Sequence, residues 1–131
     1  MELLPVLLVE DQPDDQFLTL RTLKKLKIRN VVVANEGEEA LRYLQETVDL
    51  KFGDSSPLPE LIILDLRMPK IDGFELLESL KSADRTKEIP VIVLSSSPQE
   101  SDRSRCINLG AKAYLEKPLD LEAFECVLRK L

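Results

Sequence analysis

The sequence predicts a doubly wound α/β fold, in which one parallel sheet carries helices on both faces. Five short apolar runs alternate along the chain with segments whose apolar residues have helical spacing. The runs are continuously apolar, as expected for parallel strands that are covered on both faces. At 131 residues the chain has the size of one ordinary domain, so we expect a single domain over residues 1–131.

The first predicted strand is Leu3–Val9, and a helix is expected to start beside Pro13. Proline is tolerated in the first turn of a helix, and Asp14 and Asp15 suit the positive end of the helix dipole. Apolar residues then recur at helical spacing, which predicts a face that packs on the sheet. They are Phe17, Leu20, Leu23 and Leu26.

The second predicted strand is Val31–Ala34, and Asn35 with Glu38 forms a candidate capping pair for the helix that follows. Its apolar face is expected to consist of Ala40, Leu41 and Leu44. The stretch from Thr47 to Glu60 is rich in Gly, Ser and Pro and is longer than usual for a connection, which predicts an exposed loop.

The third unit is predicted from a strand at Leu61–Leu64 and a helix that Asp72 and Glu75 cap reciprocally. A core-facing stripe of Phe74, Leu77 and Leu80 follows.

The fourth unit combines a strand at Val91–Leu94 with a helix over 98–109, for which Ser97 and Glu100 form the candidate cap beside Pro98. Gly110 is placed to end this helix. Only three apolar residues are available to pack it, so we expect it to be the least firmly held element. They are Cys106, Ile107 and Leu109.

The fifth unit is a strand at Ala113–Leu115 and a helix with an apolar stripe. Five alternating units favour the flavodoxin-like strand order 2-1-3-4-5, in which strands one and three lie side by side at the topological switch point. The stripe consists of Leu121, Phe124, Leu128 and Leu131.

The amino-acid composition argues against several classes of function. The 24 acidic residues exceed the 18 basic ones, and the net charge of -6 argues against direct binding to nucleic acid. No apolar stretch approaches the roughly 20 residues that span a bilayer, so we expect no membrane insertion. Cys106 and Cys126 are predicted to be reduced packing residues of a cytoplasmic protein. The chain has no histidine, so any histidine in its chemistry belongs to a partner.

Three acidic side chains follow the strands at the switch point. Glu10 and Asp11 end the first strand and Asp65 ends the third, and ligands of such sheets bind outside the carboxyl ends of the strands. Converging carboxylates raise one another's pKa and favour a cation that joins them. A hard divalent ion with oxygen ligands, Mg²⁺ above all, is the expected occupant.

A hydroxyl and an ammonium group reach the same edge, because Ser95 ends the fourth strand and Lys117 follows the fifth. Phosphoryl transfer to a carboxylate needs a nucleophile, a metal and hydrogen-bond donors. We therefore expect Asp65 to be the nucleophile, Asp11 to bind the metal directly, and Glu10 to bind it directly or through water. Lys117 would hold the phosphoryl group and Ser95 would donate a hydrogen bond to it.

Five motifs follow one another along the chain: Glu10-Asp11, the run from Asp65 to Gly73, Ser95, Tyr114 and Lys117-Pro118. In these motifs and their order, and over essentially its whole length, the chain resembles the receiver domains of two-component response regulators. It implies a stand-alone receiver without an output domain, a phosphoacceptor rather than an enzyme, which assists its own phosphorylation and dephosphorylation in a phosphorelay.

The resemblance also implies residue roles that the spacing alone does not. The backbone carbonyl of Arg67 would complete the metal site, for which Mn²⁺ would substitute, and Lys117-Pro118 would be a cis peptide. Tyr114 would be an aromatic switch coupled to Ser95, and the signal would be read on the surface of the fourth helix, fifth strand and fifth helix. The charged Arg67 flanks the phosphorylation site, so the lifetime of the phosphorylated state does not carry over from the family.

Partners follow from the same resemblance. A sensor histidine kinase would be the phosphodonor, with a phytochrome as candidate because of the long loop after Thr47 and the Asp65-to-Pro69 run. A histidine phosphotransfer protein and a second copy of the chain, bound through the signalling surface, are further candidate partners.

Three alternatives compete with this interpretation. One is an inactive receiver that only binds partners. Another is a phosphatase of the haloacid dehalogenase type, which would need a second Asp where this chain has Arg67. The third is a flavodoxin, whose phosphate loop would replace the acidic pair after the first strand.

Overall fold

The structure, a computed structural model, describes residues 5–49, 58–67, 72–96 and 99–131. One parallel sheet has the strand order β2-β1-β3-β4-β5, which confirms the predicted topology. β1 pairs with β2 and β3 on its two sides, so the ends of β1 and β3 are adjacent. The strands are β1 Val6–Val9, β2 Val31–Ala34, β3 Leu61–Asp65, β4 Val91–Ser95 and β5 Ala113–Glu116.

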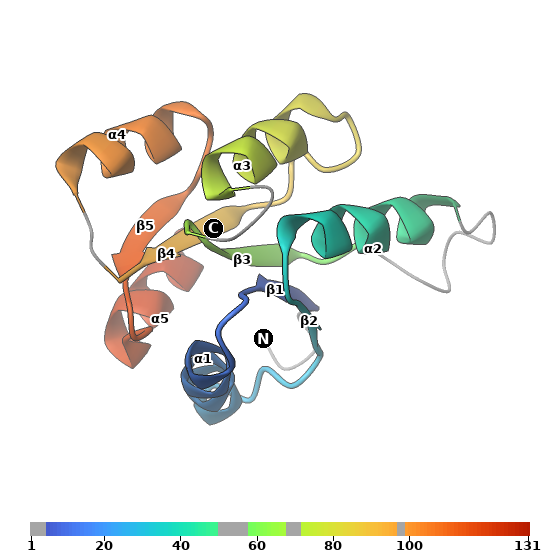
Figure 1. Ribbon diagram of the computed structural model, residues 1–131. Helices are drawn as coiled ribbons and strands as arrows, with labels where there is room; N and C mark the ends of the chain where they lie inside the picture. The colour runs from blue at the N-terminus through green and yellow to red at the C-terminus, as the bar shows by residue number, and fades with distance from the viewer. Residues whose placement is uncertain (1–4, 50–57, 68–71, 97–98) are drawn as a thin grey trace.

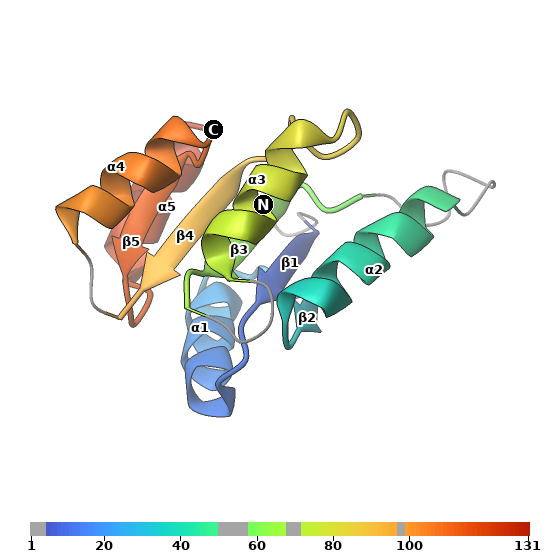
Figure 2. The same ribbon diagram turned by 45° about the horizontal axis from the view of Figure 1, so that its top comes forward.

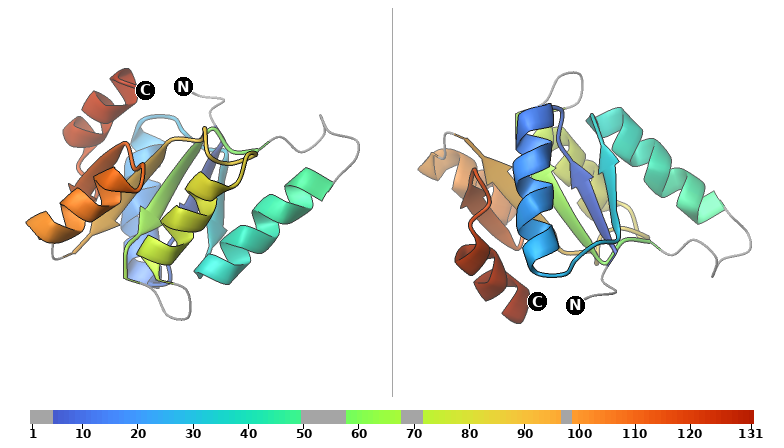
Figure 3. Two further views of the ribbon diagram at one scale, coloured as in Figure 1. Left: turned by 90° about the horizontal axis from the view of Figure 1, so that it is seen from above. Right: turned by 90° about the horizontal axis from the view of Figure 1, so that it is seen from below.

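Helices cover both faces of the sheet. α2, α3 and α4 lie on one face, and α1 and α5 lie on the other (Figures 1 and 3). Figure 2 shows the first group in front of the strands. The helices are α1 Pro13–Lys25, α2 Gly37–Asp49, α3 Gly73–Ser82, α4 Glu100–Asn108 and α5 Leu121–Arg129.

The sheet divides the core into two apolar clusters. Successive residues of a strand point to opposite faces, so Leu7 packs toward α2 and α3 while Leu8 packs toward α1 and α5. Leu77 and Phe124 are fully buried members of the two clusters. Both faces are therefore sealed, which accounts for the continuously apolar strands.

Helix start and stop signals were predicted with mixed success. The reciprocal cap of Asp72 and Glu75 is confirmed, and Pro13 occupies the first turn of α1. The Asn35 amide donates to the side chain of Glu39, one residue beyond the predicted partner Glu38. The Asp120 side chain accepts from the Ala123 N–H at 2.9 Å, a cap that we did not predict.

Several boundaries and packing predictions need correction. α2 extends to Asp49, so the predicted loop from Thr47 begins inside a helix, because the helical backbone continues into the polar stretch. Phe17 is 61% exposed, lying outside the buried stripe of α1 with the Arg21 guanidinium above its ring. Leu131 is 49% exposed beyond the last turn of α5. The Leu3 strand start, the Ser97 cap and the Pro98 helix start lie outside the described residues.

Two glycines hold the chain where a side chain would not fit. Gly110 follows α4 with φ of 110°, a left-handed conformation that ends the helix as predicted. Gly73 begins α3 directly against β3: its N–H donates to the Leu66 carbonyl at 2.8 Å, and a Cβ there would lie 2.6 Å from the Leu66 backbone. The start of α3 is thereby fastened to the end of the strand that carries Asp65.

Candidate functional site

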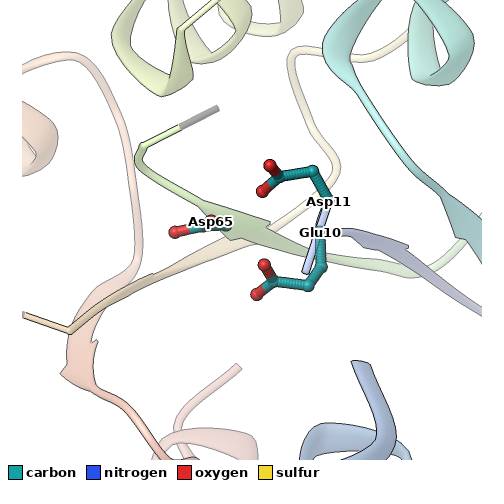
Figure 4. Close-up of side chains that lie close together, drawn as sticks. All are labelled: Glu10, Asp11 and Asp65. Atoms are coloured by element: carbon teal, nitrogen blue, oxygen red, sulfur yellow. The ribbon is translucent and has the colours of Figure 1, made fainter. Parts of the chain in front are cut away.

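Three carboxyl groups meet at the carboxyl ends of β1 and β3. Glu10 and Asp11 follow β1, Asp65 is the last residue of β3, and one ligand oxygen from each lies within 4.8 Å of the others. Figure 4 shows the three side chains close together at this edge of the sheet. Glu10 and Asp65 are buried and Asp11 is half-buried, so the predicted acidic cluster is present.

Backbone hydrogen bonds place Glu10. Its N–H donates to the Ala34 carbonyl at 3.0 Å, which extends the pairing with β2, and its carbonyl accepts from Gln16 Nε2 at 2.6 Å. The Gln12 N–H donates to Glu10 Oε2 at 3.2 Å. The Glu10 side chain is therefore buried at the carboxyl ends of the strands and does not point to solvent.

Burial makes the charge on Glu10 costly. It raises the pKa of Glu10 to about 7, the close contact with the Lys117 ammonium counteracts the rise, and the negative charge of Asp65 adds to it. A cation bound beside this carboxyl group would lower its pKa and favour loss of the proton.

Lys117 is the cation already in the cluster. Its ammonium lies 2.9 Å from Glu10 Oε1, 2.9 Å from Asp15 Oδ2 and 3.2 Å from Asp65 Oδ1, and its side chain is 10% exposed. Burial alone lowers the pKa of Lys117. The hydrogen bond to Asp15 and the ion-pair contacts with Glu10 and Asp65 outweigh burial, so the pKa is raised above its ordinary value.

Asp15 was not predicted to belong to this site. It lies in the first turn of α1, and its contact with Lys117 joins residues 102 positions apart in the chain. The sequence expectation for Asp15 was only an electrostatic contribution to the helix start. The signal that would have found it is its position on the helix that begins beside the acidic pair.

Ser95 and Lys117 come to the same edge as predicted. Ser95 is the last residue of β4 and is 2% exposed, and its carbonyl accepts from the Lys117 N–H at 2.8 Å. The peptide between Lys117 and Pro118 is cis, which confirms that expectation. The turn after β5 therefore lies against the end of β4.

Tyr114 lies in the core cluster on the side of α4. Its ring is buried, and within the described residues its hydroxyl has no hydrogen-bond partner. The ring borders a hollow of about 310 Å³ that is also lined by Arg103 and Glu116. Burying a hydroxyl without a hydrogen-bond partner costs on the order of 1–3 kcal/mol, so this position is unfavourable for the Tyr114 hydroxyl.

Arg67 lies next to the acids through its backbone and reaches away through its side chain. Its N–H donates to Asp65 Oδ1 at 3.3 Å, whereas its guanidinium forms an ion pair with Asp102 of α4 at 3.0 Å. The placement of its carbonyl as a metal ligand stays a prediction.

The acidic cluster fits a hard divalent cation. Within the described residues, the buried Asp11 Oδ1 has no hydrogen-bond partner, and Glu10 Oε1 faces Lys117 without a well-directed hydrogen bond. The Lys117 ammonium contacts two of the three carboxyl groups, Glu10 and Asp65, so negative charge exceeds positive charge in this partly desolvated space. Oxygen ligands of this kind suit Mg²⁺ or Mn²⁺.

No helix in the described part of the chain is both long enough and apolar enough to cross a membrane.

Sequence comparison identifies a protein family that matches almost the whole chain. The pattern of the response regulator receiver domain matches residues 6–129. Response regulator Rcp1 of Synechocystis is 36% identical over 118 residues, which cover 89% of this chain and 78% of that protein.

Three solved structures are similar to this chain in both fold and sequence. The bacteriophytochrome response regulator AtBRR superposes with a TM-score of 0.84 at 42% identity, covering 100% of this chain and 94% of that one. The Mn²⁺-bound form of response regulator Rcp1 gives a TM-score of 0.74 at 36% identity, covering 93% and 87%. The phosphorylated cyanobacterial phytochrome response regulator RcpA gives 0.76 at 35% identity, covering 94% and 87%. The chain therefore belongs to the response regulator receiver domain family of two-component signalling proteins.

Proposed function

We propose that this chain is a phosphoacceptor that takes a phosphoryl group onto Asp65 from a phosphohistidine of a sensor histidine kinase. A carboxylate oxygen of Asp65 forms the new P–O bond while the P–N bond to the donor histidine breaks, and the imidazole leaves with the bonding electrons. The observation that carries this proposal is the Lys117 ammonium 3.2 Å from Asp65 Oδ1, inside a cluster of three carboxylates.

Glu10, Asp11 and Asp65 would hold Mg²⁺, with Mn²⁺ as a substitute, and the Arg67 carbonyl would complete the site. When bound, the ion supplies positive charge to the phosphoryl oxygens. The Mn²⁺-bound form of Rcp1, a protein 36% identical to this one, supports a divalent ion here.

Lys117 and Ser95 supply the remaining donors. Lys117 already lies beside Asp65, so its ammonium can bind a phosphoryl oxygen with little movement. Ser95 lies on the strand next to β3 and would donate its hydroxyl to another oxygen. These groups also assist the return reaction, in which water removes the phosphoryl group.

The signal would pass through Tyr114 to the surface formed by α4, β5 and α5. The Ser95 hydroxyl moves toward the phosphoryl group, and the Tyr114 ring and α4 adjust to the space that it leaves. The hollow between α4 and β5, and a Tyr114 hydroxyl without a partner among the described residues, support two ring arrangements of similar energy. A partner, or a second copy of the chain, would bind on this surface.

The kinase is proposed to be a phytochrome, because AtBRR and RcpA are phytochrome response regulators. A histidine phosphotransfer protein is the alternative donor. The free thiols of Cys106 and Cys126 fit a reducing compartment, the cytoplasm.

The test is incubation with acetyl phosphate and Mg²⁺ followed by intact-mass measurement. We expect the native chain to gain the mass of one phosphoryl group and Asp65→Asn to gain none. Asp14→Asn removes the same kind of side chain from an exposed position and should be phosphorylated like the native chain. Chelation of Mg²⁺ should abolish the gain.

The rival functions predict other results. An inactive receiver would show no added mass in any variant. A phosphatase of the haloacid dehalogenase type would release inorganic phosphate over many turnovers, although Arg67 occupies the place of its second Asp.

A further inference from the structure

Lys117 has three carboxylate partners, and one of them lies outside the acidic cluster. Glu10 and Asp65 supply ligand oxygens to that cluster, whereas Asp15 does not. Asp15 Oδ2 nevertheless lies 2.9 Å from the Lys117 ammonium, as close as Glu10 Oε1. A third element, α1, thus contributes to the placement of the ammonium.

The contact with Asp15 Oδ2 has hydrogen-bond geometry, whereas the contacts with Glu10 and Asp65 are ion pairs. A lysine ammonium has three N–H groups, and three carboxylates surround this one. The lysine stem has four rotatable carbons and is flexible unless its head is bound. In this structure the head is bound on three sides, and the side chain is 10% exposed.

The three partners differ in what happens to them when Asp65 is phosphorylated. Asp65 carries the phosphoryl group, and Glu10 belongs to the carboxylates that fit a divalent cation. Asp15 has neither task. It is therefore the carboxylate that stays available to Lys117 throughout the reaction.

We propose that Asp15 is a positioning residue that holds the Lys117 ammonium beside Asp65, ready for a phosphoryl oxygen. This inference rests on the proposed phosphorylation of Asp65. It assigns to the first turn of α1 a part in phosphoryl transfer, although Asp15 itself touches neither the phosphoryl group nor the metal.

A purely structural role for Asp15 is the competing explanation. A carboxylate in the first turn of a helix stabilises that helix through its dipole. Asp14 is in the same turn, carries the same charge and is exposed, so it has the dipole role without the lysine. Asp14→Asn and Asp15→Asn are therefore matched variants that separate the two roles.

The first experiment compares phosphorylation rates with acetyl phosphate and Mg²⁺, followed by intact mass. We expect Asp15→Asn to be phosphorylated roughly fivefold or more slowly than the native chain, because a misplaced catalytic group is costly. Asp14→Asn should match the native chain, and the thermal midpoints of the two variants should be alike. Equal rates for Asp14→Asn and Asp15→Asn would overturn the proposal.

A second comparison asks whether Asp15 acts through Lys117. In a Lys117→Ala chain, which is slower from the start, adding Asp15→Asn should cause no further loss. If Asp15→Asn slows that chain by the same factor as it slows the native one, Asp15 acts elsewhere and the proposal fails.

A third measurement does not depend on phosphorylation. In the metal-free chain, NMR relaxation of the Lys117 methylene next to the ammonium should show a rigid side chain in the native and Asp14→Asn proteins and a mobile one in Asp15→Asn. An unchanged Lys117 in Asp15→Asn would sink the inference. Absence of phosphate on the native chain would instead sink the proposed function.

Discussion

The two cysteines have opposite environments, although both lie on helices. Cys106 is fully buried, and burial together with the charge of Asp102 raises the pKa of its thiol to about 11 despite the nearby Arg105. Cys126 lies on the exposed face of α5, so the prediction that it packs in the core is wrong. Neither forms a disulfide.

Alkylation at neutral pH should therefore modify only one thiol. Iodoacetamide reacts with thiolates, so we expect Cys126 to be labelled in minutes while Cys106 stays unmodified in the folded chain. Intact mass should show one added group in native protein and two in urea. Cys126→Ser should remove the label from native protein, and labelling of Cys106 at the same rate would contradict its burial.

At the residue scale, the sequence predicts the site well where a residue ends a strand. Parallel strands bring their carboxyl ends to one edge, so Glu10, Asp65 and Ser95 could be placed together before any coordinates. Asp15 could not, because an acid in a first helical turn already has a local explanation, and its partner is 102 residues away.

At the element scale, α4 buries few side chains, as its sequence predicts, and its weak attachment stays a prediction. Cys106 is its single buried residue, and Ile107 is 42% exposed. Side-chain contacts hold α4 in addition. Asp102 is paired with Arg67, and the Arg103 guanidinium donates to the Tyr114 carbonyl at 3.4 Å. The Arg105 guanidinium lies 3.9 Å from the centroid of the Phe74 ring. Helical periodicity does not predict these contacts, because it indicates only which face of a helix is apolar.

The Arg67–Asp102 ion pair should affect the local opening of α4 more than global stability. Arg67 is 66% exposed, and such pairs contribute at most about 1 kcal/mol. We expect Asp102→Ala to speed amide hydrogen exchange in α4 roughly two- to fivefold, with little change in the thermal midpoint.

Arg67→Ala is the matched control for that prediction, because it breaks the same pair without changing the charge at the start of α4. Both single variants and the double variant should accelerate exchange by the same factor. Additive effects would mean that Asp102 acts through the helix dipole instead of through Arg67.

At the scale of the whole molecule, the strand order and the layers can be predicted from the sequence, whereas the residue at which a helix ends cannot. The alternation of apolar runs with helical stripes is enough to predict the β2-β1-β3-β4-β5 sheet. The end of α2 at Asp49 was missed, because a polar stretch rich in turn residues does not show where helical hydrogen bonding stops.

The acidic site should also shape global stability in the metal-free protein. The pKa of Glu10 is raised from 4.5 to about 7, so between these values the unfolded chain loses a proton that the folded chain keeps. Stability therefore falls as pH rises through this window, by at most on the order of 3 kcal/mol. Urea unfolding from pH 4.5 to 7.5 measures the effect.

Glu10→Gln should remove that part of the pH dependence, so the difference between the two profiles isolates Glu10. Added Mg²⁺ should stabilise the native chain more at pH 7.5 than at pH 5.5, because binding must displace the proton below about pH 7. Parallel profiles for native and Glu10→Gln protein would contradict the raised pKa.

The acidic cluster, Ser95 and Lys117 all lie at the carboxyl ends of the strands, so the opposite end of the sheet is remote from the proposed phosphorylation chemistry. α5 returns from that carboxyl edge after β5 and ends at Arg129, so the C-terminus lies at the amino edge, as the marked chain end in Figure 3 shows. A fluorescent reporter joined after Leu131 would sit on the far side from Asp65 but next to the proposed signalling surface, because Leu131 lines one hollow together with Ile107 and Tyr114. Such a label would suit a biosensor that responds to partner binding, whereas a pull-down reagent needs this surface uncovered.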